Sequence, residues 1–390
     1  MAEIPPARES RALTRPLLVL AALALVAISI MAQLYGPIAL LPEIAEYYGT
    51  GIDRSALVVS SFGFALAFGF MVFGRLSDKF GRRFCMVTGL VGTAIFSALV
   101  GFADDLDTII WLRAGQGFFC AGFPPSTIAW LQERLPERLR YTGIAIFTCS
   151  LLLAGIVGQI LASAGGFGAP PRWPTIAPAI FFLAAALLVA LCLPGGPAGR
   201  QVGKAGLAAI PFRALAPVFV GSALSLAPFV LFFAAIEIEV AKGGLDIDPT
   251  LVRYAGLPGL LATAFAGRPM RVWGAERMAL AGFGIMGAML LAPVALPLEA
   301  GIYVAGFLFT FGIAFSIPAL LSIVGSAAPD ARALAISVHA CVQFVGVALA
   351  PAAAEALLQA GAGLAGISLV GAGLSLLVVA VNWRGLMPRR

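Results

Sequence analysis

The chain has 390 residues, of which 61% are hydrophobic and only 11% are charged. This balance excludes an ordinary soluble protein, because a globule has too little core to hide so many apolar side chains. The net charge of +6 does not indicate a nucleic-acid partner, since the basic residues form short clusters between apolar runs. The five cysteines show no CxxC spacing, so neither a disulfide framework nor a metal site is expected.

Apolar runs of about 20 residues follow one another along the chain, each long enough to cross roughly 30 Å of hydrocarbon as a helix. After a polar tail of residues 1–15, helices are expected near residues 16–41, 54–74, 84–102, 108–131, 141–164 and 173–193. Residues 194–212 are rich in Gly and Pro and predict a linker. Helices are then expected near residues 213–240, 250–267, 278–297, 300–323, 332–358 and 361–383, before a tail of residues 384–390.

This pattern predicts an all-α membrane protein with twelve transmembrane helices. The two halves, residues 16–193 and 213–383, are each expected to form a six-helix bundle. With a cytoplasmic N-terminus, most of the 25 Lys and Arg residues fall in cytoplasmic segments, as the positive-inside rule requires. Both termini are therefore expected in the cytoplasm, with the protein in the inner membrane. The Lys and Arg residues assigned to outside loops are Arg54, Arg172, Lys242 and Arg253.

Several landmarks of the first half recur about 193 residues later, close to half the chain length. The corresponding pairs are Gly74 with Gly267, Gly81 with Gly274, Pro124 with Pro318, and Arg140 with Arg332. A six-plus-six repeat is what alternating access between two bundles requires.

The most specific segment is the expected loop Gly74-Arg75-Leu76-Ser77-Asp78-Lys79-Phe80-Gly81-Arg82-Arg83. Its glycines allow a tight turn, and its one carboxylate stands among four cations. The segment resembles the GxLxDxxGRR loop of the major facilitator superfamily. That resemblance implies gating residues at Gly74, Asp78, Gly81, Arg82 and Arg83, with Asp78 and Arg82 in the charge relay that holds the outward-facing state. In the second half, Arg271 stands where Asp78 stands in the first.

Arg113 is the one basic residue expected inside a span, where an arginine costs roughly 2.5–3.5 kcal/mol and usually faces the interior or a wet cavity. Its segment, Leu112-Arg113-Ala114-Gly115-Gln116-Gly117, resembles the RxxQG motif of the fourth helix in the same superfamily. That resemblance implies a role for Arg113, with Gln116, in proton or substrate coupling. The alternative is that Arg113 lies near the outer interface and snorkels to water.

The fifth helix contains Leu153-Ala154-Gly155-Ile156-Val157-Gly158-Gln159, which only partly resembles the GPxxGG segment of drug exporters. The proline is missing, and Gln159 and Ile160 replace the paired glycines. This departure weakens an assignment to export alone, and the remaining glycines are equally expected to allow close helix packing.

Candidate proton-coupling groups are few, because no Asp or Glu is expected in the middle of a span. Glu237 and Glu239 stand toward the outer end of the seventh helix, where low dielectric would favour their protonated forms. The alternative is that they are solvated helix ends. His339, the only histidine, is expected either to shuttle protons or to pack as a neutral, hydrogen-bonded side chain.

Uncharged polar side chains within spans are candidates for lining a central cavity or for bonding between helices. They are Gln33, Tyr35, Gln116, Gln159 and Gln343. The sequence contains neither the nucleotide-binding pattern GxxxxGK[ST] nor the metalloprotease pattern HExxH, so no enzyme activity and no cofactor are expected.

These features predict a secondary transporter similar to the twelve-helix exporters of the superfamily. We expect a monomer in the lipid bilayer that exports small amphipathic organic compounds in exchange for protons. Uptake of a small organic anion is the alternative, favoured by Arg113 as a counter-ion. A non-transporting receptor or scaffold built on the same fold is the alternative from another class.

Overall fold

The computed structural model describes residues 6–165, 176–194, 210–328 and 332–386, and within them every regular element is a helix. The first half contains α1 (Pro6–Tyr35), the 3₁₀ helix η1 (Gly36–Leu40), α2 (Leu41–Tyr47), α3 (Ile52–Phe80), α4 (Arg82–Val100), α5 (Leu106–Cys120), α6 (Pro124–Arg134), α7 (Glu137–Ser163) and α8 (Ile176–Cys192). The second half contains α9 (Phe212–Leu224), α10 (Ala227–Ala241), α11 (Pro249–Leu261), η3 (Ala262–Phe265), α12 (Gly267–Trp273), α13 (Ala275–Leu290), α14 (Ala292–Ala295), α15 (Leu298–Ala327), α16 (Arg332–Gln359) and α17 (Gly363–Leu386).

The prediction of an all-helical membrane protein is confirmed. Within the described ranges, nine helical stretches are long and apolar enough to cross a membrane. Most of the expected linker, residues 194–212, lies outside the described residues, as does Arg172. The first helix begins earlier than expected, at Pro6, and so extends into the expected N-terminal tail.

Prolines break several stretches that were expected to be continuous helices. The single helix expected near residues 108–131 is wrong, because α5 ends at Cys120 and α6 starts at Pro124. A proline has no N–H to donate and disfavours helical geometry in the residue before it. The helix expected near residues 213–240 is likewise divided into α9 and α10, with Pro228 in the first turn of α10.

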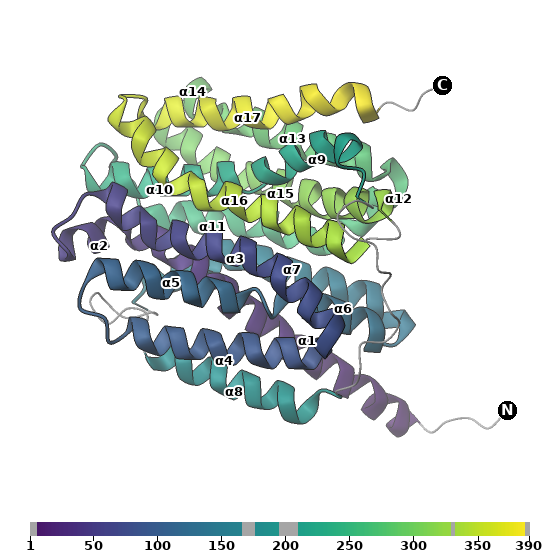
Figure 1. Ribbon diagram of the computed structural model, residues 1–390. Helices are drawn as coiled ribbons and strands as arrows, with labels where there is room; N and C mark the ends of the chain where they lie inside the picture. The colour runs from purple at the N-terminus through teal and green to yellow at the C-terminus, as the bar shows by residue number, and fades with distance from the viewer. Residues whose placement is uncertain (1–5, 166–175, 195–209, 329–331, 387–390) are drawn as a thin grey trace.

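The helices of the first half lie together in the lower part of Figure 1, and those of the second half lie above them. In the first half α1 packs mainly along α7 and α4 along α8, whereas in the second half α13 packs against both α15 and α17. The halves meet mainly where α3 packs against α16 and α7 against α11. The start of α1 and the end of α17 lie at the same end of the molecule (Figure 1).

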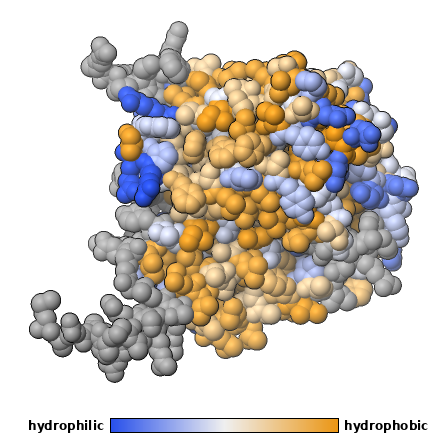
Figure 2. Space-filling view, turned by 180° about the vertical axis from the view of Figure 1, so that it is seen from behind, coloured by the Kyte–Doolittle hydropathy of each residue, from blue (hydrophilic) through white to orange (hydrophobic). Residues whose placement is uncertain are grey.

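The surface has the distribution of polarity that a bilayer demands. On the face shown in Figure 2, hydrophobic residues form a broad band and hydrophilic residues gather toward the two ends. Large apolar side chains are exposed at the surface of the protein, as expected where lipid tails take the place of water. Examples are Phe68, Trp111, Leu191 and Phe265.

Gly81 and Gly274, which the sequence repeat pairs with each other, adopt nearly the same backbone conformation. Gly81 has φ 93° and ψ 154°, and Gly274 has φ 84° and ψ 154°. Each residue directly precedes a helix, α4 in one half and α13 in the other. This backbone region is open essentially to glycine alone.

Replacing Gly274 with alanine is expected to lower the free energy of unfolding by roughly 1–3 kcal/mol, the usual cost of a side chain in such a conformation. No atom lies within 4 Å of a Cβ built at Gly274, so backbone strain alone produces the effect. Unfolding of the purified protein in detergent measures it. Gly267→Ala is the matched control, because a Cβ at Gly267 also meets no atom within 4 Å and the residue lies in α12. Equal losses in the two variants would contradict the conformational explanation.

Candidate functional site

Arg113 is enclosed within the first half of the chain. Its side chain is 0% exposed, and its guanidinium donates to the backbone oxygens of Gln33 at 2.5 Å and Val58 at 3.3 Å. It also donates to Oε1 of Gln116, and its central carbon lies 4.3 Å from the centre of the Phe62 ring. The expectation of an interior position is confirmed, and the alternative of snorkelling to the outer interface is wrong. A coupling role for Arg113 stays a prediction.

Gln116 continues this polar network between helices. Its Nε2 donates to Oγ of Ser97 at 2.7 Å and to Oε1 of Gln33 at 3.3 Å. The network thereby joins α5 to α1, α3 and α4. Gln33 and Gln116 therefore act here through hydrogen bonds between helices, the second of the two roles expected for them.

Arg253 lies at a different place from the one predicted from the sequence. It was expected in an outside loop, but it lies in α11 and is only 1% exposed. The helix begins at Pro249, close to the expected residue 250, and Asp248 caps it by accepting a hydrogen bond from the backbone N–H of Thr250 at 2.8 Å. Arg253 therefore falls within the first turns and points into the protein. Arg113 is accordingly not the only fully buried arginine among the described residues.

The guanidinium of Arg253 connects three helices. It forms an ion pair with Glu237 of α10, whose side chain is 11% exposed. It also donates to Oε1 of Gln159 and Oγ of Ser163, both on α7 and both at 3.4 Å. Because α7 belongs to the first half and α10 and α11 to the second, this cluster links the two halves.

Glu237 and Glu239 differ sharply although they stand two residues apart. Glu237 is held by Arg253, whereas Glu239 is half-buried near the end of α10 and forms no ion pair within the described residues. A further buried carboxylate, Glu355 of α16, lies with its Oε2 3.7 Å from Nζ of Lys242. The expectation that acidic groups are solvated at helix ends is therefore wrong for Glu237.

A cavity of about 120 Å³ lies between the two halves. Helices α1, α3, α6 and α7 form one side, and α15, α16 and the α9–α10 break form the other. The lining is mostly apolar and contains no charged residue within the described part of the chain. Its polar members are Tyr35, Thr148, Ser337, His339 and Gln343. Of the residues predicted to line a central cavity, Tyr35 and Gln343 line this one, whereas Gln33 and Gln159 are not among its described lining residues. A role of these residues in binding cargo stays a prediction.

His339 and Gln343 are both anchored to the break between α9 and α10. Nδ1 of His339 lies 2.7 Å from Oγ of Ser222, and Nε2 of Gln343 donates to Oγ of Ser225 at 2.8 Å. His339 is 3% exposed, which fits a hydrogen-bonded histidine packed at the edge of the cavity. A proton-shuttling role for His339 stays a prediction.

The halves touch on both sides of this cavity along α3 and α16. At one side, a Cβ on Gly74 would lie 2.6 Å from Oγ of Ser337, so the helices approach closely there. At the other side, Oγ of Ser60 donates to the backbone oxygen of Ala348 at 2.6 Å. The cavity therefore lies between two contacts made by the same pair of helices.

The prediction of a loop over residues 74–83 is wrong, because α3 extends to Phe80 and α4 begins at Arg82, so Gly81 alone makes the turn between them. The arginines at the start of α4 bind neighbouring helices of the same half. Arg82 forms an ion pair with Glu133 of α6 at 3.1 Å, and it also donates to Oγ of Ser77 at 3.2 Å. Arg83 donates to the backbone oxygens of Ala190 and Leu193, at 3.2 and 3.1 Å, and so binds the end of α8. Asp78 lies in the last turn of α3, but its side chain is outside the described part of the structure.

Comparisons with known proteins agree with this architecture. The family model of the Major Facilitator Superfamily matches residues 21–240. An uncharacterized MFS-type transporter of Bacillus subtilis (strain 168), YceJ, is 25% identical over 338 residues, which cover 82% of this chain and 84% of that protein.

Two further relatives are named as efflux pumps. A multi-drug resistance efflux pump PmrA homolog of Lactococcus lactis is 24% identical over 286 residues, covering 68% of this chain and 69% of that protein. The multidrug efflux pump LfrA of Mycolicibacterium smegmatis is 30% identical over 160 residues, which span only 40% of this chain and 30% of that protein. The family match covers more than half of the chain and includes Arg113, the segment of residues 74–83 and Glu237. The chain therefore belongs to the Major Facilitator Superfamily.

Proposed function

We propose that this protein exports small amphipathic compounds in exchange for protons, through twelve transmembrane helices arranged as two six-helix bundles. The observation that carries the proposal is the cavity between the halves, flanked along α3 and α16 by the close approach of Gly74 to Ser337 and by the hydrogen bond from Ser60 to Ala348. Opening the Gly74–Ser337 contact would expose the cavity to one side, and opening the Ser60–Ala348 contact would expose it to the other. This is the geometry that alternating access requires. We place both termini in the cytoplasm and the protein, as a monomer, in the inner membrane.

The chemistry of the cavity supports an amphipathic cargo. Phe70 and Phe344, whose ring centres are 5.3 Å apart, supply apolar surface from the two halves. Gln343 and His339 supply neutral hydrogen-bonding groups. No charged side chain lines the cavity among the described residues, so an anionic cargo finds no counter-ion there. The efflux names of the relatives support the same direction of transport.

The cluster of Glu237, Arg253 and Gln159 suits a coupling role. A proton that reaches Glu237 neutralises the carboxylate and leaves the Arg253 charge without its ion-pair partner, in a site where charge is poorly solvated. The hydrogen bonds from Arg253 to α7 join the halves, so protonation changes a contact between them. A proton that crosses with the field gains about 2.3 kcal/mol per 100 mV, which is enough to drive a solute gradient of tens-fold.

The test is accumulation of a panel of labelled compounds in bacteria that lack their own pumps and express this protein, with and without a protonophore. We expect lower accumulation than in control cells, and we expect both the protonophore and Glu237→Gln to abolish the difference. Gln343→Leu is expected to change which compounds are exported but not the effect of the protonophore. Val342→Leu on the same helix is the matched control, since Val342 does not line the cavity.

Two outcomes would overturn this function. Higher accumulation in expressing cells would establish uptake in place of export. No difference for any compound, with the protein present in the membrane, would favour the non-transporting receptor or scaffold.

A further inference from the structure

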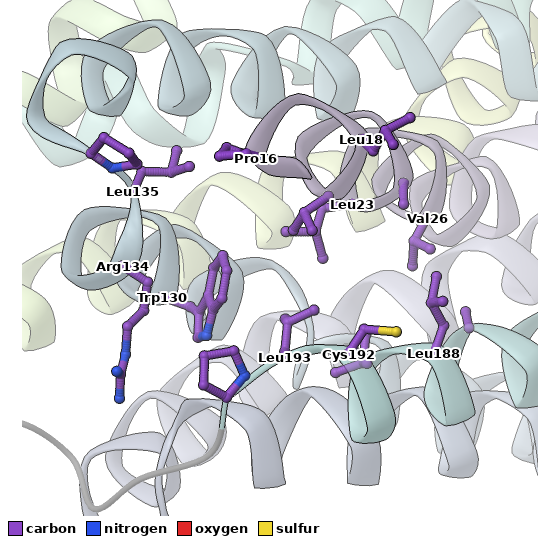
Figure 3. A pocket seen from close by; sticks show the side chains of 16 residues that line it. Pro16, Leu18, Leu23, Val26, Trp130, Arg134, Leu135, Leu188, Cys192 and Leu193 are labelled. Carbon is purple, nitrogen blue, oxygen red and sulfur yellow. The ribbon is translucent and has the colours of Figure 1, made fainter. Parts of the chain in front are cut away.

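A lateral groove of about 780 Å³ lies between α1, α6 and α8 (Figure 3). It exists because α1 packs mainly along α7 and α8 along α4, so the facing sides of α1 and α8 are not packed against each other. The volume falls in the range of roughly 300–1,000 Å³ that is usual for ligand sites. The groove shares no lining residue with the central cavity, so it is a separate site.

The walls of the groove are apolar, and its mouth opens on the lipid-facing surface. Leu23, Val26 and Leu193 form the inner walls and are buried. Leu18 and Leu188 stand at the mouth and are 64% and 46% exposed. In a membrane, these exposed side chains meet acyl chains, so the medium next to the groove is lipid.

Two polar side chains stand on one wall of this apolar groove, as Figure 3 shows. Trp130 is 7% exposed, and its buried Nε1–H has no hydrogen-bond acceptor among the described residues. Arg134, in the last turn of α6, is exposed and takes part in none of the ion pairs found in the described part of the chain. A buried donor without an acceptor beside an unpaired cation favours an occupant with anionic oxygens.

We propose that the groove binds one phospholipid with an anionic headgroup. An acyl chain lies against Leu23, Val26 and Leu188, the headgroup oxygens accept a hydrogen bond from Nε1 of Trp130, and Arg134 pairs with the headgroup charge. Charge complementarity selects this class of lipid, because Arg134 is the only charged residue among the described residues that line the groove, and no carboxylate among them opposes an anion. The site lies at the end of the molecule where α6 and α8 end, next to the start of α4, where Arg82 binds Glu133 of α6 and Arg83 binds the end of α8.

The test uses the full-length protein, purified and delipidated in detergent, with phosphatidylglycerol and phosphatidylcholine added in equal amounts. Native mass spectrometry then counts the bound lipids. We expect one retained phosphatidylglycerol per protein, and we expect Arg134→Gln to reduce its preference over phosphatidylcholine about fivefold, as for one basic residue near an anionic surface. Trp130→Phe is expected to weaken retention of phosphatidylglycerol while keeping the protein's elution profile.

Ala22→Phe tests the groove itself, because Ala22 lines it and a phenyl ring would fill it. We expect this variant to lose the retained lipid, while Ala21→Phe, at the exposed neighbouring position, keeps it. Equal retention in Ala22→Phe and Ala21→Phe would overturn the site. Equal binding of the two lipids to the unmodified protein would overturn the headgroup assignment.

Two competitors separate a phospholipid from other occupants. Displacement by excess inorganic phosphate would show that a free anion is sufficient and would overturn the lipid proposal. Displacement by an amphipathic dye such as ethidium would place the groove on the route of the cargo and would overturn it as well. Retained lipid in the presence of both competitors supports the proposal, whether or not the protein proves to be a proton-coupled exporter.

Discussion

Replacing Glu237 with glutamine is expected to abolish protonophore-sensitive export and to lower the free energy of unfolding by about 3–5 kcal/mol, the usual cost of removing one partner of a buried ion pair. Arg253 is 1% exposed, and its remaining hydrogen-bond partners, Gln159 and Ser163, are neutral. The variant therefore leaves a buried positive charge with too little compensation. The compound-accumulation assay measures the first effect, and unfolding in detergent measures the second.

Two further variants separate stability from transport. Glu237→Gln combined with Arg253→Gln removes both charges, so most of the stability is expected to return while export stays absent. Glu239→Gln is the matched control on the same helix, because Glu239 forms no ion pair among the described residues. Wild-type export by Glu237→Gln would rule out the coupling role, and wild-type stability would rule out the energetic argument.

Replacing Arg113 with lysine is expected to lower the free energy of unfolding by roughly 3 kcal/mol and to reduce export. The compact ammonium group cannot reach the oxygens of Gln33, Val58 and Gln116 together, so at least two charge-assisted hydrogen bonds are lost, each worth about 1.5 kcal/mol or more. Export falls because these bonds set the positions of α1 and α3 against α5. Unfolding in detergent and the accumulation assay provide the measurements.

Arg54→Lys is the matched control for this prediction. Arg54 pairs with Asp107, but the two side chains are 51% and 66% exposed, so no measurable change is expected. Phe62→Leu removes the ring beside the Arg113 guanidinium while leaving its hydrogen bonds, and it separates the two contributions. If Arg113→Lys proves as stable as Arg54→Lys, the network does not contribute as the geometry indicates.

The sequence predicted the helical membrane fold well, because apolar runs long enough to cross a bilayer as a helix rarely have another structural role. The glycines at residues 81 and 274 were also predictable, since only glycine adopts their backbone conformation. Helix breaks were less visible, because the sequence continues through Pro124 and Pro228 without a charged residue to mark an end.

The candidate site was only partly predictable. Charge patterns assign an arginine near a helix start to the outside, and this reasoning placed Arg253 in a loop. The helix itself was expected to begin near residue 250, however, and that start already places Arg253 within the first turn of a helix. Its partners could not be read from the sequence, because Gln159 and Ser163 are about 90 residues away and meet it only when the halves pack together.

The positions of the two buried arginines have a consequence for how the protein is made. Chains enter the membrane from the N-terminus onward during synthesis. Gln33, Val58 and Phe62 are already made when Arg113 leaves the ribosome, and Gln116 follows at once. Gln159, Ser163 and Glu237 likewise all precede Arg253 in the chain. Most partners of each guanidinium are thus synthesised before it. Neither arginine therefore remains unpaired in the lipid until a later helix is made.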